Sequence, residues 1–144
     1  MNMYIKQLSI FIENREGRLE EVLNALTEAN INIVSMSLAD TSEYGLLRLL
    51  VSNPEEGKEA LKAKGFSAML TDVLAVKISH RAGKLQELLK VICEAQVNIE
   101  YMYALSTGKD DASIVIKTSD LDKAAALLQA RGVDVVTSEE VMSM

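Results

Sequence analysis

Two short loops combine a glycine with polar side chains in an order suited to binding a small anion. They read Asn14-Arg15-Glu16-Gly17-Arg18-Leu19 and His80-Arg81-Ala82-Gly83-Lys84-Leu85. Each loop follows a stretch with strand periodicity and precedes one with helix periodicity, so each glycine stands at a helix start. The first N–H groups of a helix lack partners and carry partial positive charge, and glycine permits close backbone approach. The loops therefore predict a cradle for a carboxylate.

A second polar position recurs at the same spacing as the glycine. The segment from Glu28 to Ile33 reads EANINI, and the segment from Glu94 to Ile99 reads EAQVNI. The spacing from Gly17 to Gly83 equals the spacing from Asn32 to Asn98. A hydrophobic core requires only apolar residues of suitable size. The recurrence of glycine and asparagine therefore indicates two copies of one unit and a shared requirement for backbone geometry or ligand.

Composition limits the functions that the chain can have. The 144 residues carry a net charge of −6, which argues against nucleic acid as a partner. No apolar run is long enough to cross a membrane, and the N-terminus lacks a signal-peptide pattern. With one Cys and one His, neither a disulfide nor a metal site is expected, and we expect no cofactor. We expect a cytoplasmic protein.

Each copy has the same predicted order of strands and helices. Alternating apolar residues mark a first strand around residues 8–12 and again around 74–78, and helices with one apolar face follow each loop. Later strands are predicted, in pairs, at 33–40 and 99–106, 46–52 and 113–118, and 66–72 and 133–141.

The second helix of each copy has clear start and stop signals. Pro54 and Asp120 suit the first turn and the N-cap, and Gly65 and Gly132 follow a basic residue as helix stops. These two glycines are slightly further apart than the loop glycines, so the second copy carries one extra residue in the preceding hairpin.

The order β-α-β-β-α-β predicts an α+β fold. Right-handed crossovers would give two ferredoxin-like units, each an antiparallel four-stranded sheet with both helices on one face. The predicted domains are residues 1–72 and 73–144. No linker separates them, because one predicted strand continues into the next near Asp72-Val73.

The duplicated pattern resembles the ACT domain, a small regulatory module of amino-acid metabolism. The glycine with its following leucine and the later Asn-Ile match in both copies. Glu16 and Ala82 stand where ACT loops often have proline, and His80 stands where Asn or Asp is usual. The resemblance implies a regulatory sensor that binds a free amino acid or similar small carboxylate at an inter-domain interface and is coupled to assembly or to a partner enzyme. The implied ligand-binding residues are Asn14, Arg15, Glu16, Gly17, Asn32, His80, Arg81, Ala82, Gly83 and Asn98.

Several alternatives remain open at the level of sequence. The glycines alternatively serve only to turn a strand into a helix, and Asn32 and Asn98 only to form turns. A protein-interaction or oligomerisation module without a ligand is the alternative function. The element order also occurs in RNA-recognition domains, but the acidic chain lacks the aromatic residues that those place on their third strands. No nucleophile, base and orienting group converge, so we expect no enzyme. We expect a homodimer, with a metabolic enzyme as the partner, and the sites form either within one chain or between two.

Overall fold

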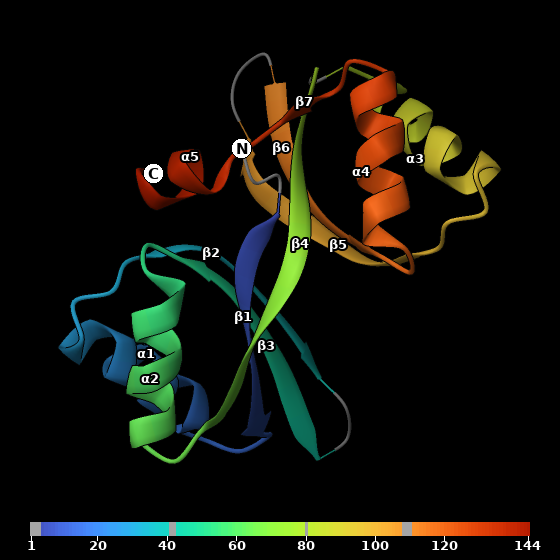
Figure 1. The fold of residues 1–144 in the computed structure, drawn as a ribbon. Helices are drawn as coiled ribbons and strands as arrows, with labels where there is room; N and C mark the ends of the chain where they lie inside the picture. Colours follow the sequence, from blue (N-terminus) through green and yellow to red (C-terminus); the bar gives the residue numbers. More distant parts are fainter. Residues whose placement is uncertain (1–3, 41–42, 80, 108–110) are drawn as a thin grey trace. The chain divides into compact units, whose positions relative to one another are not determined.

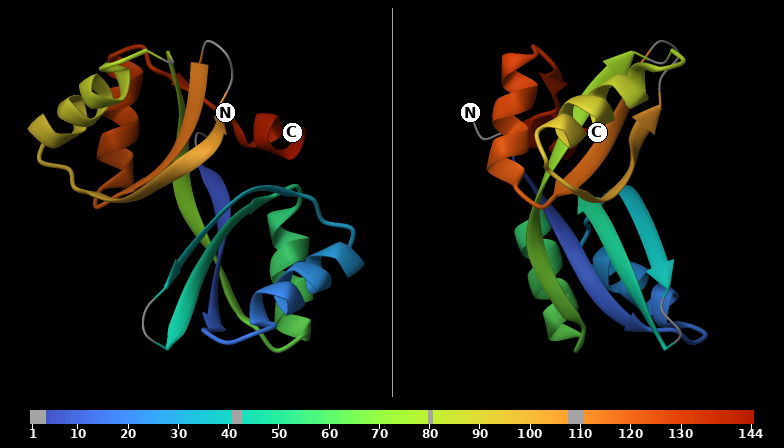
Figure 2. Two further views of the ribbon diagram at one scale, coloured as in Figure 1. Left: turned by 180° about the vertical axis from the view of Figure 1, so that it is seen from behind. Right: turned by 90° about the vertical axis from the view of Figure 1, so that its right-hand side faces the viewer.

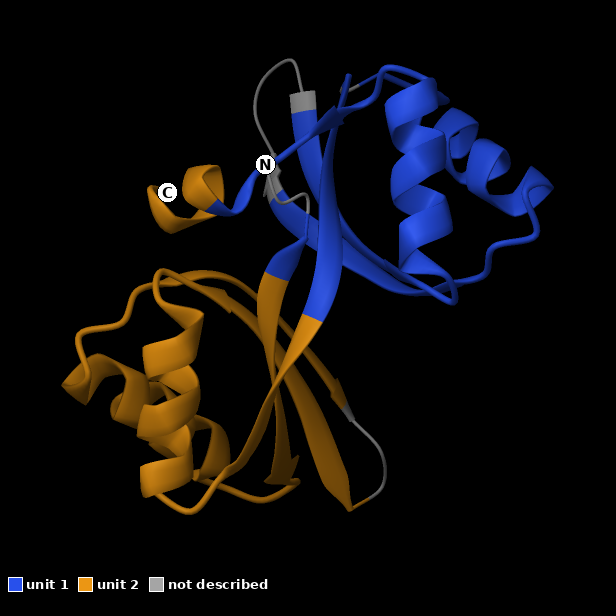
Figure 3. Cartoon of the chain, viewed as in Figure 1, with its two compact units in different colours: residues 1–5, 72–138 blue, residues 6–71, 139–144 orange. Residues whose placement is uncertain are grey.

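The computed structural model describes residues 4–40, 43–79, 81–107 and 111–144, and these form two compact units. The N-unit comprises residues 6–71 and 139–144 and is orange in Figure 3. The C-unit comprises residues 72–138 together with the N-terminal residues up to Ile5 and is blue. Each unit therefore contains one repeat and a short segment from the opposite end of the sequence.

The N-unit has the predicted order of elements, and in Figure 1 both of its helices lie on the same face of its sheet. Its sheet order is β2-β3-β1-β4, in which β3 pairs antiparallel with both β1 and β2. The elements are β1 (Ile5–Glu13), α1 (Arg18–Glu28), β2 (Ile33–Asp40), β3 (Tyr44–Val51), α2 (Pro54–Ala63) and the start of β4 (Ser67–Ser79).

The C-unit repeats this arrangement. The end of β4 pairs antiparallel with β6 on one side and β7 on the other, and β5 pairs antiparallel with β6. Figure 2 shows both helices on one face of this sheet. The further elements are α3 (Lys84–Glu94), β5 (Ile99–Thr107), β6 (Asp111–Thr118), α4 (Leu121–Ala130) and β7 (Asp134–Val135). The predicted fold class, two ferredoxin-like units, is confirmed.

Strand β4 connects the two repeats without a linker. Its 13 residues run unbroken through Asp72 and Val73, where the sequence predicted that one strand continues into the next. Its first residues belong to the N-unit and those from Asp72 onward to the C-unit.

The predicted last strand, residues 133–141, is wrong over most of its length. Strand pairing ends after Val136, whose N–H donates to the carbonyl of Ala75 at 2.8 Å. The chain then forms a short helix, α5 (Ser138–Met142). Ser138 and two glutamates open it, and these residue types favour a helix start over strand continuation.

Each unit has its own apolar core between sheet and helices. In the N-unit the alternating residues Leu8, Ile10 and Ile12 of β1 pack with helix residues such as Leu26 and Leu61. In the C-unit Leu74 and Val76 take the equivalent positions and pack against residues such as Ile92 and Leu128. Tyr4 also packs against this core, and its hydroxyl donates a hydrogen bond to the Asp122 carboxylate. The predicted inward faces of both first strands are confirmed.

Each of the four helices of the repeats is followed, two residues after its end, by a residue with left-handed backbone conformation. Gly65 and Gly132 have φ of 86° and 68°, as the predicted stops require. Asn30 and Gln96 adopt φ of 59° and 63°, a conformation that asparagine tolerates better than most residues with a Cβ.

Candidate functional site

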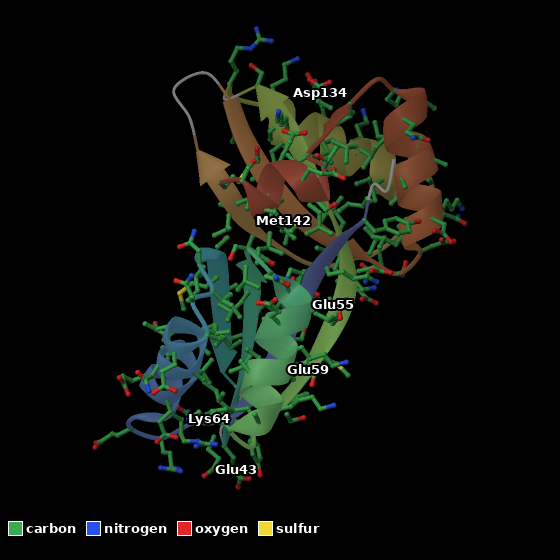
Figure 4. All side chains as sticks on the ribbon, turned by 60° about the vertical axis from the view of Figure 1, so that its left-hand side comes forward. Glu43, Glu55, Glu59, Lys64, Asp134 and Met142 are labelled. Carbon is green, nitrogen blue, oxygen red and sulfur yellow. The ribbon has the colours of Figure 1, made fainter. Side chains whose placement is uncertain are left out.

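The first glycine loop turns β1 directly into α1. Gly17 adopts φ 83° and ψ −16°, a left-handed conformation, and forms the N-cap of α1. The Asn14 N–H donates to the Glu43 carbonyl at 2.9 Å, which fixes the loop to the turn before β3 (Glu43 is labelled in Figure 4). The side chains of Asn14, Arg15 and Glu16 are exposed around a surface depression. The loop is thus held by its backbone while its side chains face solvent.

The second glycine loop has the same geometry. Gly83 adopts φ 89° and ψ −13° as the N-cap of α3. The Lys84 N–H donates to the Arg81 carbonyl at 3.2 Å, as the Arg18 N–H does to the Arg15 carbonyl at 3.4 Å. Ala82 is exposed, like Glu16 at the matching position. His80 lies outside the described residues.

The starts of the four repeat helices fall into two kinds. The Asn53 side chain caps α2 by accepting from the Glu56 N–H at 3.4 Å, and Asp120 caps α4 by accepting from the Lys123 N–H at 3.1 Å. Glycine caps α1 and α3, and neither receives a side-chain hydrogen bond. The first-turn N–H groups of these two helices are therefore not covered by a cap side chain, which is the condition for accepting an external anion.

The arginines of the two loops have different neighbours. The Arg15 Nε donates to the Glu13 carboxylate at 2.9 Å. This hydrogen bond, with the positive charge of Arg15, holds the pKa of the Glu13 carboxyl below its ordinary value. In the second loop the Arg81 Nε donates to the neutral Ser79 hydroxyl at 3.0 Å. The first arginine is thus compensated by a carboxylate, whereas the second is held by a neutral partner.

Asn32 and Asn98 stand just before β2 and β5, each fixed through its backbone. The Asn32 N–H donates to the Ser52 hydroxyl at 3.0 Å, and the Ser52 N–H donates to the Asn32 carbonyl at 2.9 Å. Asn98 and Ser119 make the same two bonds at 3.0 and 2.8 Å. Sequence reasoning missed these serines, although they recur at the same spacing as the glycines that end α2 and α4. Both asparagines are exposed, so their side chains face outward.

Within one unit the two halves of the predicted site are not brought together. Asn14 and Gly17 precede α1, whereas Asn32 follows its end, and 11 helical residues span roughly 16 Å. Asn98 is separated from Gly83 by α3 in the same way. The structure therefore presents a glycine loop and an asparagine at opposite ends of the first helix of each unit.

The described part of the chain gives no support for a metal centre or a membrane span. No group of three or more His, Cys, Asp or Glu residues among the described residues is arranged to hold a metal ion. None of the described helices combines the length and apolarity needed to cross a membrane.

Comparison with known proteins identifies the family. The family model described as an ACT domain pair matches residues 3–144. The chain therefore belongs to the ACT domain family, as a tandem pair.

Solved structures agree with this assignment. Protein BT0572 from Bacteroides thetaiotaomicron is similar at 35% identity over 99% of this chain and 98% of that one, with a TM-score of 0.93. The regulatory subunit of aspartate kinase from Thermus thermophilus, in a ligand-free form, shares the fold at 20% identity and a TM-score of 0.66, covering 90% of this chain and 91% of that one. That from Thermus flavus shares it at 21% identity and a TM-score of 0.64, with the same coverage. No curated protein matches the chain.

Proposed function

We propose that the chain is a regulatory sensor that binds a free amino acid at its glycine loops. The observation that carries the proposal is the contrast between helix starts. The two helices that follow the loops begin at left-handed glycines without a side-chain cap, whereas α2 and α4 are capped by Asn53 and Asp120. A ligand carboxylate would supply the missing acceptor at α1 and α3.

The exposed side chains of the loops supply the remaining polar contacts. Asn14 and Arg15, with Glu16, would contact the ligand in one loop, and His80, Arg81 and Ala82 stand in the matching positions of the other. An amide both donates and accepts, so it can read an ammonium and a carboxylate at once.

The asparagines at the far helix ends complete the site when two units come together. Asn32 and Asn98 each lie a helix length from the glycine loop of their own unit. One ligand can therefore contact a glycine loop and an asparagine together only where the loop of one unit meets the strand start of another. We propose that a homodimer provides this meeting. Ligand binding would then favour one arrangement of units over another, which is how a small ligand regulates a partner enzyme.

The comparisons support regulation of an enzyme of amino-acid metabolism, and we propose that this takes place in the cytoplasm. The ACT domain pair matches the whole described chain, and solved structures with this fold include regulatory subunits of aspartate kinase. We propose that the partner is likewise a separate metabolic enzyme.

A ligand-free interaction module is the second candidate, and exposed apolar side chains favour it. Phe11 and Met69 in the N-unit are 54% and 56% exposed. Exposed apolar side chains that form a contiguous patch are one mark of a protein contact surface.

A thermal-shift screen with the common amino acids separates the two functions. A ligand at about 100 times its dissociation constant should add roughly 2.7 kcal/mol to the folded state. We expect one amino acid or a few related ones to raise the melting temperature, and Asn14→Ala or Asn98→Ala to remove the gain. Asn24→Ala is the matched control, because Asn24 is an exposed asparagine on α1 that bonds only to Glu28 among the described residues. A flat response at millimolar concentrations would reject the sensor and favour the interaction module.

A further inference from the structure

The C-unit contains a groove whose counterpart on the matching surface of the N-unit is much smaller. This C-unit groove has a volume of about 680 Å³ and is bounded by the end of β4, the second loop, α3, the end of α4 and β7. Binding sites for small organic molecules commonly have volumes of about 300–1,000 Å³. The groove is therefore large enough for a metabolite whose apolar part is much larger than a methyl or hydroxymethyl group.

Its walls combine an apolar surface with polar edges. Leu88 and Leu128 are buried at its base, and the half-buried residues Ile78, Val91 and Val133 extend the apolar surface. Apolar surface combined with polar groups that fix the orientation of a ligand is typical of sites for small organic molecules.

The charge of the groove is opposite to that of the chain. Five basic residues line it against three acidic ones, although the whole chain carries −6. The basic residues are Lys77, Arg81, Lys84, Lys90 and Arg131.

Two of these cations are uncompensated. The Lys84 ammonium group forms an ion pair with the Glu87 carboxylate at 3.3 Å, so the charges of these two lining residues compensate each other. Lys90 and Arg131 are exposed and make no ion pair with any residue that the structure describes. They remain available to an anionic ligand, and a guanidinium can bind a carboxylate or phosphate with two parallel hydrogen bonds.

The matching surface of the N-unit shows what closes such a groove. Phe66 stands where the C-unit has Val133 and is 6% exposed, and the Arg18 guanidinium lies 4.5 Å from the centre of its ring. The remaining depression has a volume of only about 200 Å³. Its charged residues are Glu20, Glu21 and Lys64, so its balance is acidic. Lys64 and Asp134, labelled in Figure 4, mark the two surfaces.

We propose that the C-unit groove binds an organic anion that joins a carboxylate or phosphate group to an apolar body. Lys90 and Arg131 hold the anionic group, and the surface formed by Leu88, Val91 and Val133 covers the apolar part. This site goes beyond the proposed amino-acid site: the second loop contributes Arg81 and Lys84 to its lining, but the groove extends over α4 and β7, and Lys90, Arg131 and Val133 lie outside the loop.

Calorimetric titration with three naphthalene probes tests the site. The probes are 2-naphthoate, 2-naphthyl phosphate and the neutral 2-naphthamide. We expect the two anions to bind at least about tenfold more tightly than the amide, because charge-assisted hydrogen bonds favour them. The tighter of the two anions indicates the preferred head group. Equal binding of all three probes, or no binding at millimolar concentration, would overturn the proposal.

Variants of residues outside the glycine loops locate the binding. Val133→Phe introduces the side chain that fills the N-unit, so it should abolish anion binding without unfolding the chain. Lys90→Gln with Arg131→Gln should weaken it at least about tenfold, and Asp134→Asn should strengthen it by removing a negative charge from the lining. Lys64→Gln is the matched control, since Lys64 occupies the position of Arg131 in the N-unit. Equal losses in Lys64→Gln and in the double variant would reject the site.

This outcome is independent of the amino-acid screen. Asn14→Ala and Asn98→Ala should leave naphthoate binding unchanged, and Val133→Phe should leave the amino-acid response unchanged. Different variants therefore test the proposed groove site and the proposed amino-acid site, so a negative result for one does not decide the other.

Discussion

The two units have the same order of strands and helices. They differ on the surface that lies between the first helix of the unit and the segment after its second helix. In the N-unit, Phe66 is buried there and Arg18 stacks on its ring, held in turn by Glu21 at 2.6 Å. In the C-unit, Val133 and Lys84 stand in these positions, and a groove of about 680 Å³ remains. The glycine loops beside these surfaces have the same conformation in both units.

The comparison separates the structural features that are common to both repeats from those that differ between them. The left-handed glycines, the uncapped helix starts and the serine contacts to Asn32 and Asn98 are common to both units. The ring of Phe66 and the Arg18 guanidinium occupy this surface in the N-unit, where the C-unit has Val133 and Lys84. Two sites with different ligands are therefore compatible with one repeated fold, and paired substitutions in the two units test the comparison.

The largest expected effect concerns two equivalent leucines. Leu61 and Leu128 both have 0% exposure, but only Leu128 borders the C-unit groove. Leu61→Ala should lower the free energy of unfolding by about 3–4 kcal/mol and Leu128→Ala by about 2–3 kcal/mol, because the cavity left by Leu128 can merge with the groove that it borders. Hydrogen exchange of α1 and α3 amides under urea reports each unit separately. The exposed neighbour Lys62→Ala serves as control, and a larger loss for Leu128→Ala would contradict the contrast.

The next effect follows from exchanging the side chains that close and open the groove. Phe66→Val should cost about 1–2 kcal/mol, since it removes buried aromatic surface and the cation–π contact of Arg18. Val133→Phe should cost less than this, because space for the ring already exists. Thermal unfolding of the two variants compares them. Equal losses of stability in the two variants would show that the groove does not have space for a phenylalanine ring.

Replacement of the loop glycines should have a smaller effect that is equal in both units. Gly17→Ala and Gly83→Ala should each cost about 1 kcal/mol, since their φ of 83° and 89° is unfavourable for residues with a Cβ. Little or nothing would crowd an added Cβ, so the cost comes from backbone conformation alone. Asparagine at either position should recover part of the loss. Unequal costs in urea titrations would show that the two loops are not equivalent.

The smallest effect distinguishes the loop arginines. Arg15→Gln should raise the pKa of the Glu13 carboxyl towards its ordinary value, because it removes the hydrogen bond and the charge that lower it. A lowered carboxyl pKa stabilises the fold above the ordinary pKa, and this contribution is lost as pH falls through the folded value. Carboxyl NMR titration measures the shift. Arg81→Gln is the matched control and should leave Glu13 unchanged, since Ser79 is the partner of Arg81.

The features that could be predicted from sequence are those decided by local rules. Alternation placed Leu8, Ile10 and Ile12 on the inner face of β1, and a basic residue followed by glycine located the ends of α2 and α4. The left-handed glycines before α1 and α3 also agree with the loop geometry read from the repeat.

The features that sequence reasoning missed depend on contacts between distant segments. Residues 133–141 contain several valines and were predicted as one strand, but pairing with β4 ends at Val136 and α5 follows. The C-unit groove is lined by Val133 where the N-unit has Phe66, a difference that periodicity does not detect because both residues are apolar. The roles of Ser52 and Ser119 were available from the repeat itself, because these serines occupy equivalent positions in its two copies.

The exchange of terminal segments between the units has a consequence for synthesis on the ribosome. The N-terminus is synthesised first, so Tyr4 is made before its hydrogen-bond partner Asp122 and before the C-unit core against which it packs. The N-unit likewise lacks residues 139–144 until the whole second repeat has been translated. A nascent chain halted after the first repeat would hold neither unit in full, and a cut at residue 72 would separate each repeat from a short segment of its unit.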